Sequence, residues 1–82
     1  MTVYLYKQYY DRYAYGEEYI EVFFNEEDAL KKLKQDVESF TNKKWEDIEI
    51  DEETDTLEPD YVAFDDGNGT NYFMIEEKEV IE

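Results

Sequence analysis

The chain has 82 residues and is strongly acidic, with 24 Asp and Glu residues against 8 Lys and Arg residues and a formal net charge of −16. A chain of this length forms one domain, spanning 1–82, with a modest hydrophobic core. The absence of Cys and His excludes a disulfide framework, thiol catalysis and an imidazole base or metal ligand. Because 18% of the residues are aromatic and 41% are hydrophobic, we predict a folded domain and not a disordered acidic tail.

The beginning of the chain has neither the basic region nor the apolar stretch of a secretory signal. No apolar run is long enough to cross a bilayer, and anionic lipid would repel a surface of this charge. We therefore expect a cytoplasmic protein that does not bind membranes.

Two segments near the N-terminus, 2–10 and 18–24, alternate their side chains with the period of two that is typical of strands. Both are rich in residues that favour strands, and a Gly-containing loop separates them. We therefore predict a tyrosine-rich β-hairpin over 1–24.

The two faces of this hairpin differ in character. Val3, Leu5 and Lys7 lie on one side of the first segment, and Ile20 and Val22 lie on the corresponding side of the second. We expect this aliphatic face to be the core side. The opposite face is aromatic, and its members are Tyr4, Tyr6, Tyr10, Tyr19 and Phe23.

A helix is predicted over 25–42. Asn25 is a favourable N-cap residue, and the acids at 26–28 match the positive end of the helix dipole. Apolar residues at helical spacing form one stripe, which predicts that the helix packs on one face of a sheet. The stripe consists of Ala29, Leu30, Leu33, Val37 and Phe40.

Acidic residues dominate 45–60, where Ile48 and Ile50 alternate with acids and predict a short strand followed by a loop. Beyond it, two strand-like runs flank a turn rich in Gly and Asn, which predicts a second β-hairpin over 61–77. The element order is β-β-α-β-β-β. It describes an α+β domain in which one amphipathic helix packs on one face of an antiparallel sheet.

The turn of the second hairpin resembles the middle of an EF-hand calcium loop, because Asp66 and residues 68–70 fall at its third and fifth to seventh places. That alignment puts Phe64 and Ile75 at the first and twelfth places, where a calcium loop needs carboxylates. The pattern therefore favours an ordinary hairpin turn, and no metal or other cofactor is expected.

Residues 59–60 and 76–78 resemble the PD…ExK motif of restriction-endonuclease-like, metal-dependent nucleases. Asp60 would lie across the predicted hairpin from Glu76, so that two carboxylates and Lys78 could meet and hold Mg²⁺. A nuclease must approach a polyanion, yet Lys78 is the only basic residue in 46–82. A solvated acidic strand end is the simpler interpretation, so we do not expect an enzyme.

Negative charge is concentrated in the second half of the chain. Residues 46–82 contain fifteen acids and one lysine, and 46–60 contains nine acids and no basic residue. Duplex DNA presents one charge per ~1.7 Å, so fourteen net charges match ~24 Å of duplex, close to the ~30 Å diameter of such a domain. An acidic surface of this kind could occupy the basic groove of a nucleic-acid-binding protein, without binding nucleic acid itself.

A very small, very acidic, cysteine-free chain resembles the phage-encoded DNA mimics, which include anti-CRISPR and anti-restriction proteins. Residues 22–34, a strand followed by an Asn-capped helix, are similar to many short phage and mobile-element proteins. The resemblance implies a non-enzymatic inhibitor, in the cytoplasm of a bacterial host, of a basic defence protein such as a CRISPR effector nuclease. The acids expected to contact that partner are Asp47, Glu49, Asp51, Glu52, Glu53, Asp55, Glu58, Asp60, Asp65 and Asp66.

Two other interpretations are open. Acidity can serve only to keep a small protein soluble, although solubility does not require so uneven a charge distribution. Alternatively, the aromatic hairpin face can bind a partner or a second copy of the chain, since a domain with a single helix would leave the opposite face exposed. The second interpretation predicts an interaction module, with a homodimer as one form.

Overall fold

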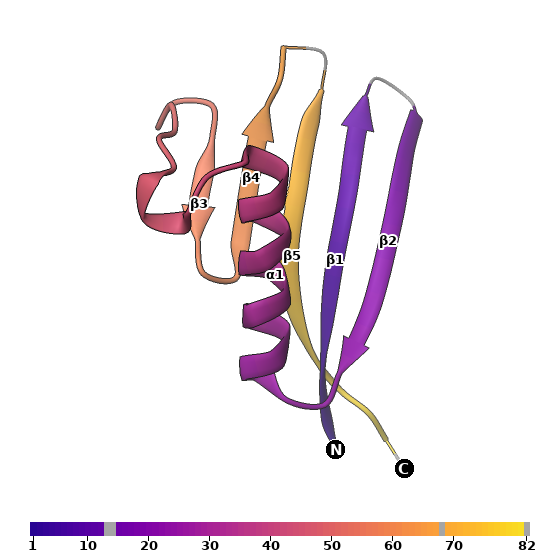
Figure 1. Cartoon of the computed structure of the whole chain (residues 1–82). Helices are drawn as coiled ribbons and strands as arrows, with labels where there is room; N and C mark the ends of the chain where they lie inside the picture. Colours follow the sequence, from indigo (N-terminus) through magenta and orange to yellow (C-terminus); the bar gives the residue numbers. More distant parts are fainter. Residues whose placement is uncertain (13–14, 68, 82) are drawn as a thin grey trace.

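The computed structural model describes residues 1–12, 15–67 and 69–81. It contains five strands, one α-helix and one short 3-10 helix (Figure 1). In chain order they are β1 (Thr2–Arg12), β2 (Tyr15–Phe23), α1 (Glu26–Thr41), η1 (Trp45–Asp47), β3 (Thr56–Glu58), β4 (Tyr61–Asp65) and β5 (Thr70–Glu79).

All five strands form one antiparallel sheet in the order β2-β1-β5-β4-β3. β1 and β5 lie side by side at its centre, which brings the two ends of the chain together at one end of the sheet (Figure 1). There the Val80 amide donates to the Met1 carbonyl at 2.7 Å. The predicted α+β fold, with one helix on an antiparallel sheet, is confirmed.

The helix begins where the sequence predicts. The Asn25 side chain accepts a hydrogen bond from the Glu27 amide at 2.8 Å, which satisfies one of the unpaired donors of the first turn. The helix ends at Asn42, whose φ of 57° is the left-handed conformation that Asn tolerates better than most residues. Among the described residues, no helix has the length and apolar character needed to span a bilayer.

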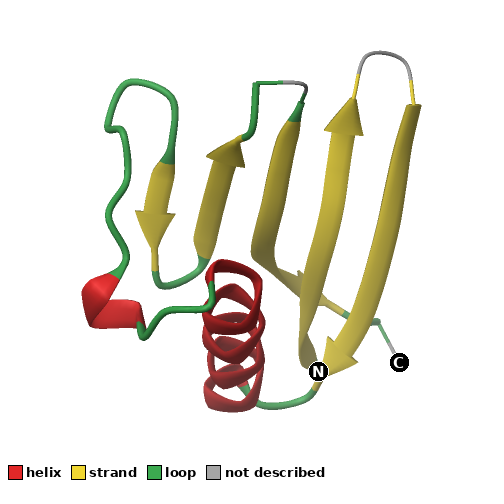
Figure 2. Cartoon of the chain, turned by 45° about the horizontal axis from the view of Figure 1, so that its top comes forward, coloured by secondary structure: helices red, strands yellow, loops and turns green. Residues whose placement is uncertain are grey.

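The core lies between α1 and one face of the sheet (Figure 2). The helix buries Ala29, Leu33 and Val37 of the predicted stripe, whereas Phe40, at its end, is half exposed. Strands from both hairpins contribute the rest, so the core joins residues that are far apart in the sequence. Its fully buried members are Tyr6, Leu33, Val37, Val62 and Phe73.

The prediction of which hairpin face is buried is wrong. Tyr6 is fully buried, and its hydroxyl donates to an Asp36 carboxylate oxygen of α1 at 2.8 Å. On the predicted core side Ile20 and Val22 are about half exposed, and only Val3, at the start of β1, is buried. The aromatic face, which was expected opposite the helix, is therefore the helix side. Alternation along β1 and β2 places Tyr4, Tyr6, Tyr10, Tyr19 and Phe23 on it.

Lys7 explains this inversion. It lies in the middle of the aliphatic side of β1, where its ammonium group pairs with Glu76 at 2.7 Å. Covering that side with a helix would remove a charged lysine from water, which is costly. A tyrosine can instead bury its ring, because its hydroxyl finds a partner on the helix.

The third strand forms later in the chain than predicted. Residues 45–47 form η1, Ile48 and Ile50 are not in a strand, and β3 begins at Thr56. The two-residue connection at 59–60 places only the residues directly before it beside β4. Ile48 instead packs against the core, so its apolar side chain is covered without a strand.

The second hairpin is confirmed. β4 and β5 pair from Tyr61 with Met74 to Asp65 with Thr70, and Gly67 in the turn has a φ of +87° that favours glycine. Asn68, which the calcium-loop alignment also used, lies outside the described residues. The described residues include no cluster of His, Cys, Asp or Glu side chains able to hold a metal ion.

Candidate functional site

The candidate acids separate into groups at the two ends of β4, as the positions of the loops in Figure 1 show. Asp47 lies in η1, before both groups in the chain. Glu58 and Asp60 flank the β3–β4 turn at one end. At the other end are seven acids that we call the loop end: Glu49, Asp51, Glu52, Glu53, Asp55, Asp65 and Asp66.

We call residues 48–55, between η1 and β3, the acidic loop, and Asp51 accepts the hydrogen bonds that form a turn within it. Its carbonyl accepts hydrogen bonds from the Thr54 amide at 3.1 Å and the Asp55 amide at 2.7 Å. Its carboxylate accepts from the Glu53 amide at 3.0 Å. The run 51–55 is thus a tight turn, because an Asp side chain can replace a backbone acceptor.

Asp55 ties this turn to the sheet. One carboxylate oxygen accepts from the Asp65 amide at the end of β4 at 2.9 Å, and the other accepts from the Asp51 amide at 3.4 Å. A carboxylate that accepts from backbone amides forms a charge-assisted hydrogen bond. The loop therefore lies at a defined position beside the second hairpin.

The turn of the second hairpin uses its acids in the same way. Asp65 accepts from the Gly67 amide at 2.8 Å, and Asp66 accepts from the Gly69 amide at 2.9 Å. The Tyr10 hydroxyl of β1 donates to Asp66 at 3.4 Å. Sequence reasoning missed these structural roles, although Asp and Asn beside Gly are a known signal of such turns.

The loop end surrounds an open hollow of about 330 Å³. Phe40 of α1 and Phe64 of β4 line it, with their rings stacked at 5.8 Å between centroids. Guanidinium and ammonium groups of a partner can bind such a surface, because they pair with carboxylates and are attracted to the faces of aromatic rings. The remaining lining includes Thr41, Lys43, Ile48, Glu49, Asp55, Asp65, Asp66 and Asn71.

Basic residues do not neutralise the acidic loop. The ion pairs within 4 Å in the described part of the chain join Glu79 to the Met1 amino group, Glu76 to Lys7, and Asp36 to Lys32. None of them involves 46–60. The hydrogen bond from Lys7 lowers the pKa of Glu76, because the ammonium group stabilises the charged form of the carboxyl group.

A second group of acids lies near the start of α1. Glu26, Asp60 and Glu77 line a hollow of about 410 Å³ beside Tyr4. Loss of solvent, followed by the charges of Glu77 and Glu26, raises the pKa of the Tyr4 hydroxyl. The sequence did not indicate this group, because Glu26 reaches it only through the packing of the helix.

The nuclease arrangement is not assembled. The Ile75 amide donates to the Asp60 carbonyl at 2.9 Å, so these residues lie opposite one another as expected. Successive side chains of a strand point to opposite faces, and Asp60 lines the helix-side hollow together with Ile75. Glu76 and Lys78 therefore lie on the other face of the sheet, and the predicted meeting of the three groups is wrong.

The predicted aromatic interface does not form one exposed surface. Tyr6 is fully buried under the helix, whereas Tyr19 is 47% exposed and donates its hydroxyl to Glu21 at 2.8 Å. Their rings meet edge to face at 6.5 Å. Tyr6 cannot contact a partner in the folded chain, and Tyr6 and Phe23 instead belong to the packing between α1 and the sheet.

Comparisons with protein-family models, curated proteins and solved structures find no match to the chain.

Proposed function

We propose that the protein is a non-enzymatic inhibitor that binds a basic, nucleic-acid-binding protein through its loop end. In this proposal the carboxylates of the loop end take the places of DNA phosphates in the basic groove of the partner. The resemblance to small phage-encoded DNA mimics suggests a bacterial defence protein, such as a CRISPR effector nuclease, as that partner. The inhibitor would then act in the cytoplasm of the bacterial host.

The observation that carries the proposal is the fixed position of carboxylates that form no ion pair within 4 Å among the described residues. Backbone amides hold the carboxylates of Asp51, Asp55 and Asp65, which fixes the backbone turn that carries Glu52 and Glu53. None of the ion pairs of the described residues involves 46–60. A mimic needs charges at fixed spacing, because a flexible acidic run loses conformational entropy when it binds.

The charge density supports the same proposal. The net charge of −16 over the 43 Å long axis is about one charge per 2.7 Å, compared with one per ~1.7 Å for duplex DNA. Along its long axis the molecule therefore carries a charge per unit length of the same order as that of duplex DNA. Binding to a basic groove should release counterions and should weaken steeply with salt.

The test compares two variants that each lose three negative charges. The first, Glu49→Gln/Glu52→Gln/Glu53→Gln, changes loop-end acids whose side chains make no hydrogen bond within the described part of the chain. The matched control, Glu58→Gln/Asp60→Asn/Glu77→Gln, changes acids at the other end of the sheet. Binding to a purified CRISPR effector and to a basic DNA-binding protein is measured from 50 to 500 mM NaCl, with and without duplex DNA as competitor.

The loop-end variant should bind at least tenfold more weakly, because each lost carboxylate removes a charge-assisted contact. Its slope of log affinity against log salt should fall by up to about 3 if each carboxylate acts as one phosphate. The control should lose much less affinity. Equal losses in both variants would show that net charge alone matters, and binding that is insensitive to salt would refute the mimic.

A further inference from the structure

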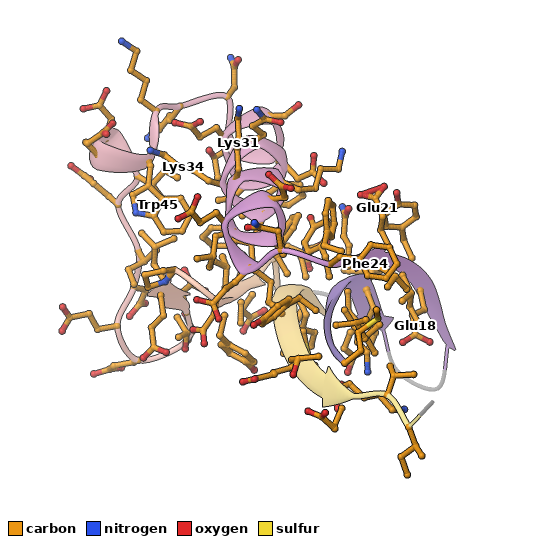
Figure 3. The ribbon with its side chains drawn as sticks, turned by 90° about the horizontal axis from the view of Figure 1, so that it is seen from below. Glu18, Glu21, Phe24, Lys31, Lys34 and Trp45 are labelled. Carbon is orange, nitrogen blue, oxygen red and sulfur yellow. The ribbon has the colours of Figure 1, made fainter. Side chains whose placement is uncertain are left out.

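The sheet face turned away from α1 is a second surface with a distinct character. We call it the open face. In the view along the strands, the labelled Lys31, Lys34 and Trp45 lie on the helix side, and Glu18 lies beside β2 (Figure 3). Alternation along the strands puts eight large apolar side chains on the open face, of which Val3 is buried within the single chain. They are Val3, Leu5, Tyr9, Ile20, Val22, Tyr61, Tyr72 and Met74.

Aromatic rings form the centre of the open face. Tyr9 of β1 stacks on Tyr72 of β5 with 4.7 Å between ring centroids, and Tyr61 of β4 meets Tyr72 edge to face at 6.3 Å. Ile20 and Val22 of the edge strand are each about half exposed and add apolar area beyond Lys7, which lies between Ile20 and Met74. A contiguous apolar area of this kind marks an interaction surface, because water is excluded from it favourably.

The open face also avoids most of the negative charge. Its described side chains include four acids and two lysines, a net charge of −2, although the whole chain carries −16. Near its centre Lys7 and Glu76 form an ion pair at 2.7 Å, and removing this pair from water opposes a contact here, so the surrounding apolar side chains must provide the affinity. The charged residues of this face are Lys7, Glu18, Glu58, Asp65, Glu76 and Lys78.

The size of the open face is sufficient for a stable contact between two copies. The strands β2, β1, β5, β4 and β3 have 9, 11, 10, 5 and 3 residues, and each residue covers ~16 Å² at a rise of ~3.3 Å and a strand spacing of ~4.8 Å. Such a footprint is on the order of 600 Å² per copy and 1,200 Å² for two, the lower limit of stable protein interfaces. The order of magnitude agrees with the 33 and 43 Å extents of the molecule.

We propose that the open face binds the open face of a second copy of this chain. The dimer would have four layers, helix, sheet, sheet and helix, with the two sheets ~10 Å apart as in a β-sandwich. A two-fold axis brings the same patch of each chain together, so an apolar and nearly neutral patch is complementary to itself.

Charge favours a second copy over other occupants. A basic partner is attracted to the loop end and not to a face with a net charge of −2, and nucleic acid is repelled by the chain as a whole. In a face-to-face dimer the least charged surfaces of two strongly acidic chains meet. Self-repulsion of the remaining charges still opposes the dimer, so added salt should strengthen it.

Analytical ultracentrifugation of the full chain tests the dimer. From 1 to 500 μM protein at 150 mM NaCl, the weight-average mass should rise from that of one chain toward that of two. The double variant Ile20→Glu/Val22→Glu should raise the dissociation constant at least 100-fold, because it places two charges in the interface. Both positions are about half exposed in the single chain, so the variant should fold.

The matched control is Gln35→Glu/Ser39→Glu, which adds the same two charges at exposed positions of α1 on the other side of the molecule. It should dimerise nearly as well as the original chain. A local reporter is the NMR signal of the Met74 methyl group, which should shift with protein concentration, whereas that of Met1 should not.

A mass that stays at one chain for every concentration and salt would overturn the dimer, as would equal dimerisation by the two double variants. Weakening of the dimer by added salt would also contradict it, because the proposed interface is apolar. The test is independent of the loop-end proposal, which predicts the opposite response to salt and is tested with substitutions at other residues.

Discussion

Tyr6 is the residue at which the helix and the sheet are joined by both packing and hydrogen bonding. Its ring is in the buried cluster with Leu33 and Val37, and its hydroxyl donates to Asp36. Asp36 also pairs with Lys32 at 3.3 Å. Burial, followed by the hydrogen bond to the Asp36 carboxylate, raises the pKa of the Tyr6 hydroxyl far above its ordinary value.

Replacing Tyr6 by Phe should lower the free energy of unfolding at pH 7 by about 1–2 kcal/mol, because it removes a hydrogen bond to a charged group but keeps the ring. The raised pKa means that the neutral hydroxyl stabilises the folded chain below the unfolded value near ~10. As pH rises above ~10, the original chain loses this stabilisation and the Tyr6→Phe variant does not. Urea denaturation at pH 7 to 11 should therefore show that the difference in free energy of unfolding between the original chain and Tyr6→Phe narrows above pH 10.

Tyr19→Phe is the matched control, because the Tyr19 hydroxyl bonds to Glu21 at the surface. It should change stability little at pH 7. A gap between the original chain and Tyr6→Phe that is constant up to pH 11 would contradict the assigned role of the Tyr6 hydroxyl.

At the scale of elements, the acidic loop is ordered by its own carboxylates. The loop between η1 and β3 has no strand partner until Thr56, and Asp55 connects it to the β4 end. Some acids of this loop thus build the turn, and the others are the ones that our proposal assigns to a partner. Glu49, Glu52 and Glu53 belong to the second group in our proposal.

Asp55→Ala should release the Asp65 amide and destabilise the chain by about 1 kcal/mol. Hydrogen exchange of that amide should become at least tenfold faster. Asp55→Asn should have a smaller effect because it keeps one carbonyl oxygen as acceptor, and Glu52→Ala should leave the exchange rate unchanged. An Asp65 amide that exchanges equally slowly in Asp55→Ala would show that the loop is held in another way.

For the whole molecule, electrostatic self-repulsion opposes folding. A net charge of −16 lies within a body of 43 × 33 × 20 Å, whose dimensions are comparable to the ~30 Å Debye length at 0.01 M salt. Compact folding brings these charges closer together than in the unfolded chain. Screening should therefore stabilise the fold.

The melting temperature should rise by several degrees from 10 mM to 500 mM NaCl. The loop-end variant Glu49→Gln/Glu52→Gln/Glu53→Gln should melt higher at low salt and should respond less to NaCl, because it carries three fewer negative charges. Differential scanning calorimetry at low protein concentration, where dimerisation is least, measures both quantities. A melting temperature independent of NaCl would show that the acids are too well solvated to repel one another.

Sequence reasoning succeeded where a feature depends on neighbouring residues. The start of α1 follows from an N-cap at Asn25, and the second hairpin follows from turn residues such as Gly67 between two strand-like runs. The third strand could not be placed from the sequence. The alternation of Ile48 and Ile50 with acids is typical of a strand, but a loop whose apolar side chains pack against the core shows the same alternation. The short connection before β4 decided which residues pair.

The sequence by itself determined the charge, its segregation, the helix and the order of the elements, because each depends on composition or on contacts a few residues apart. Only the tertiary structure decided which face of the first hairpin is buried, since both faces carry apolar side chains. Pairing of β1 with β5 places Tyr6 beside Ile75 under the helix and leaves Lys7 beside Glu76 on the open face. The same long-range packing brought the acids of the loop and of the second hairpin together at one end of the sheet.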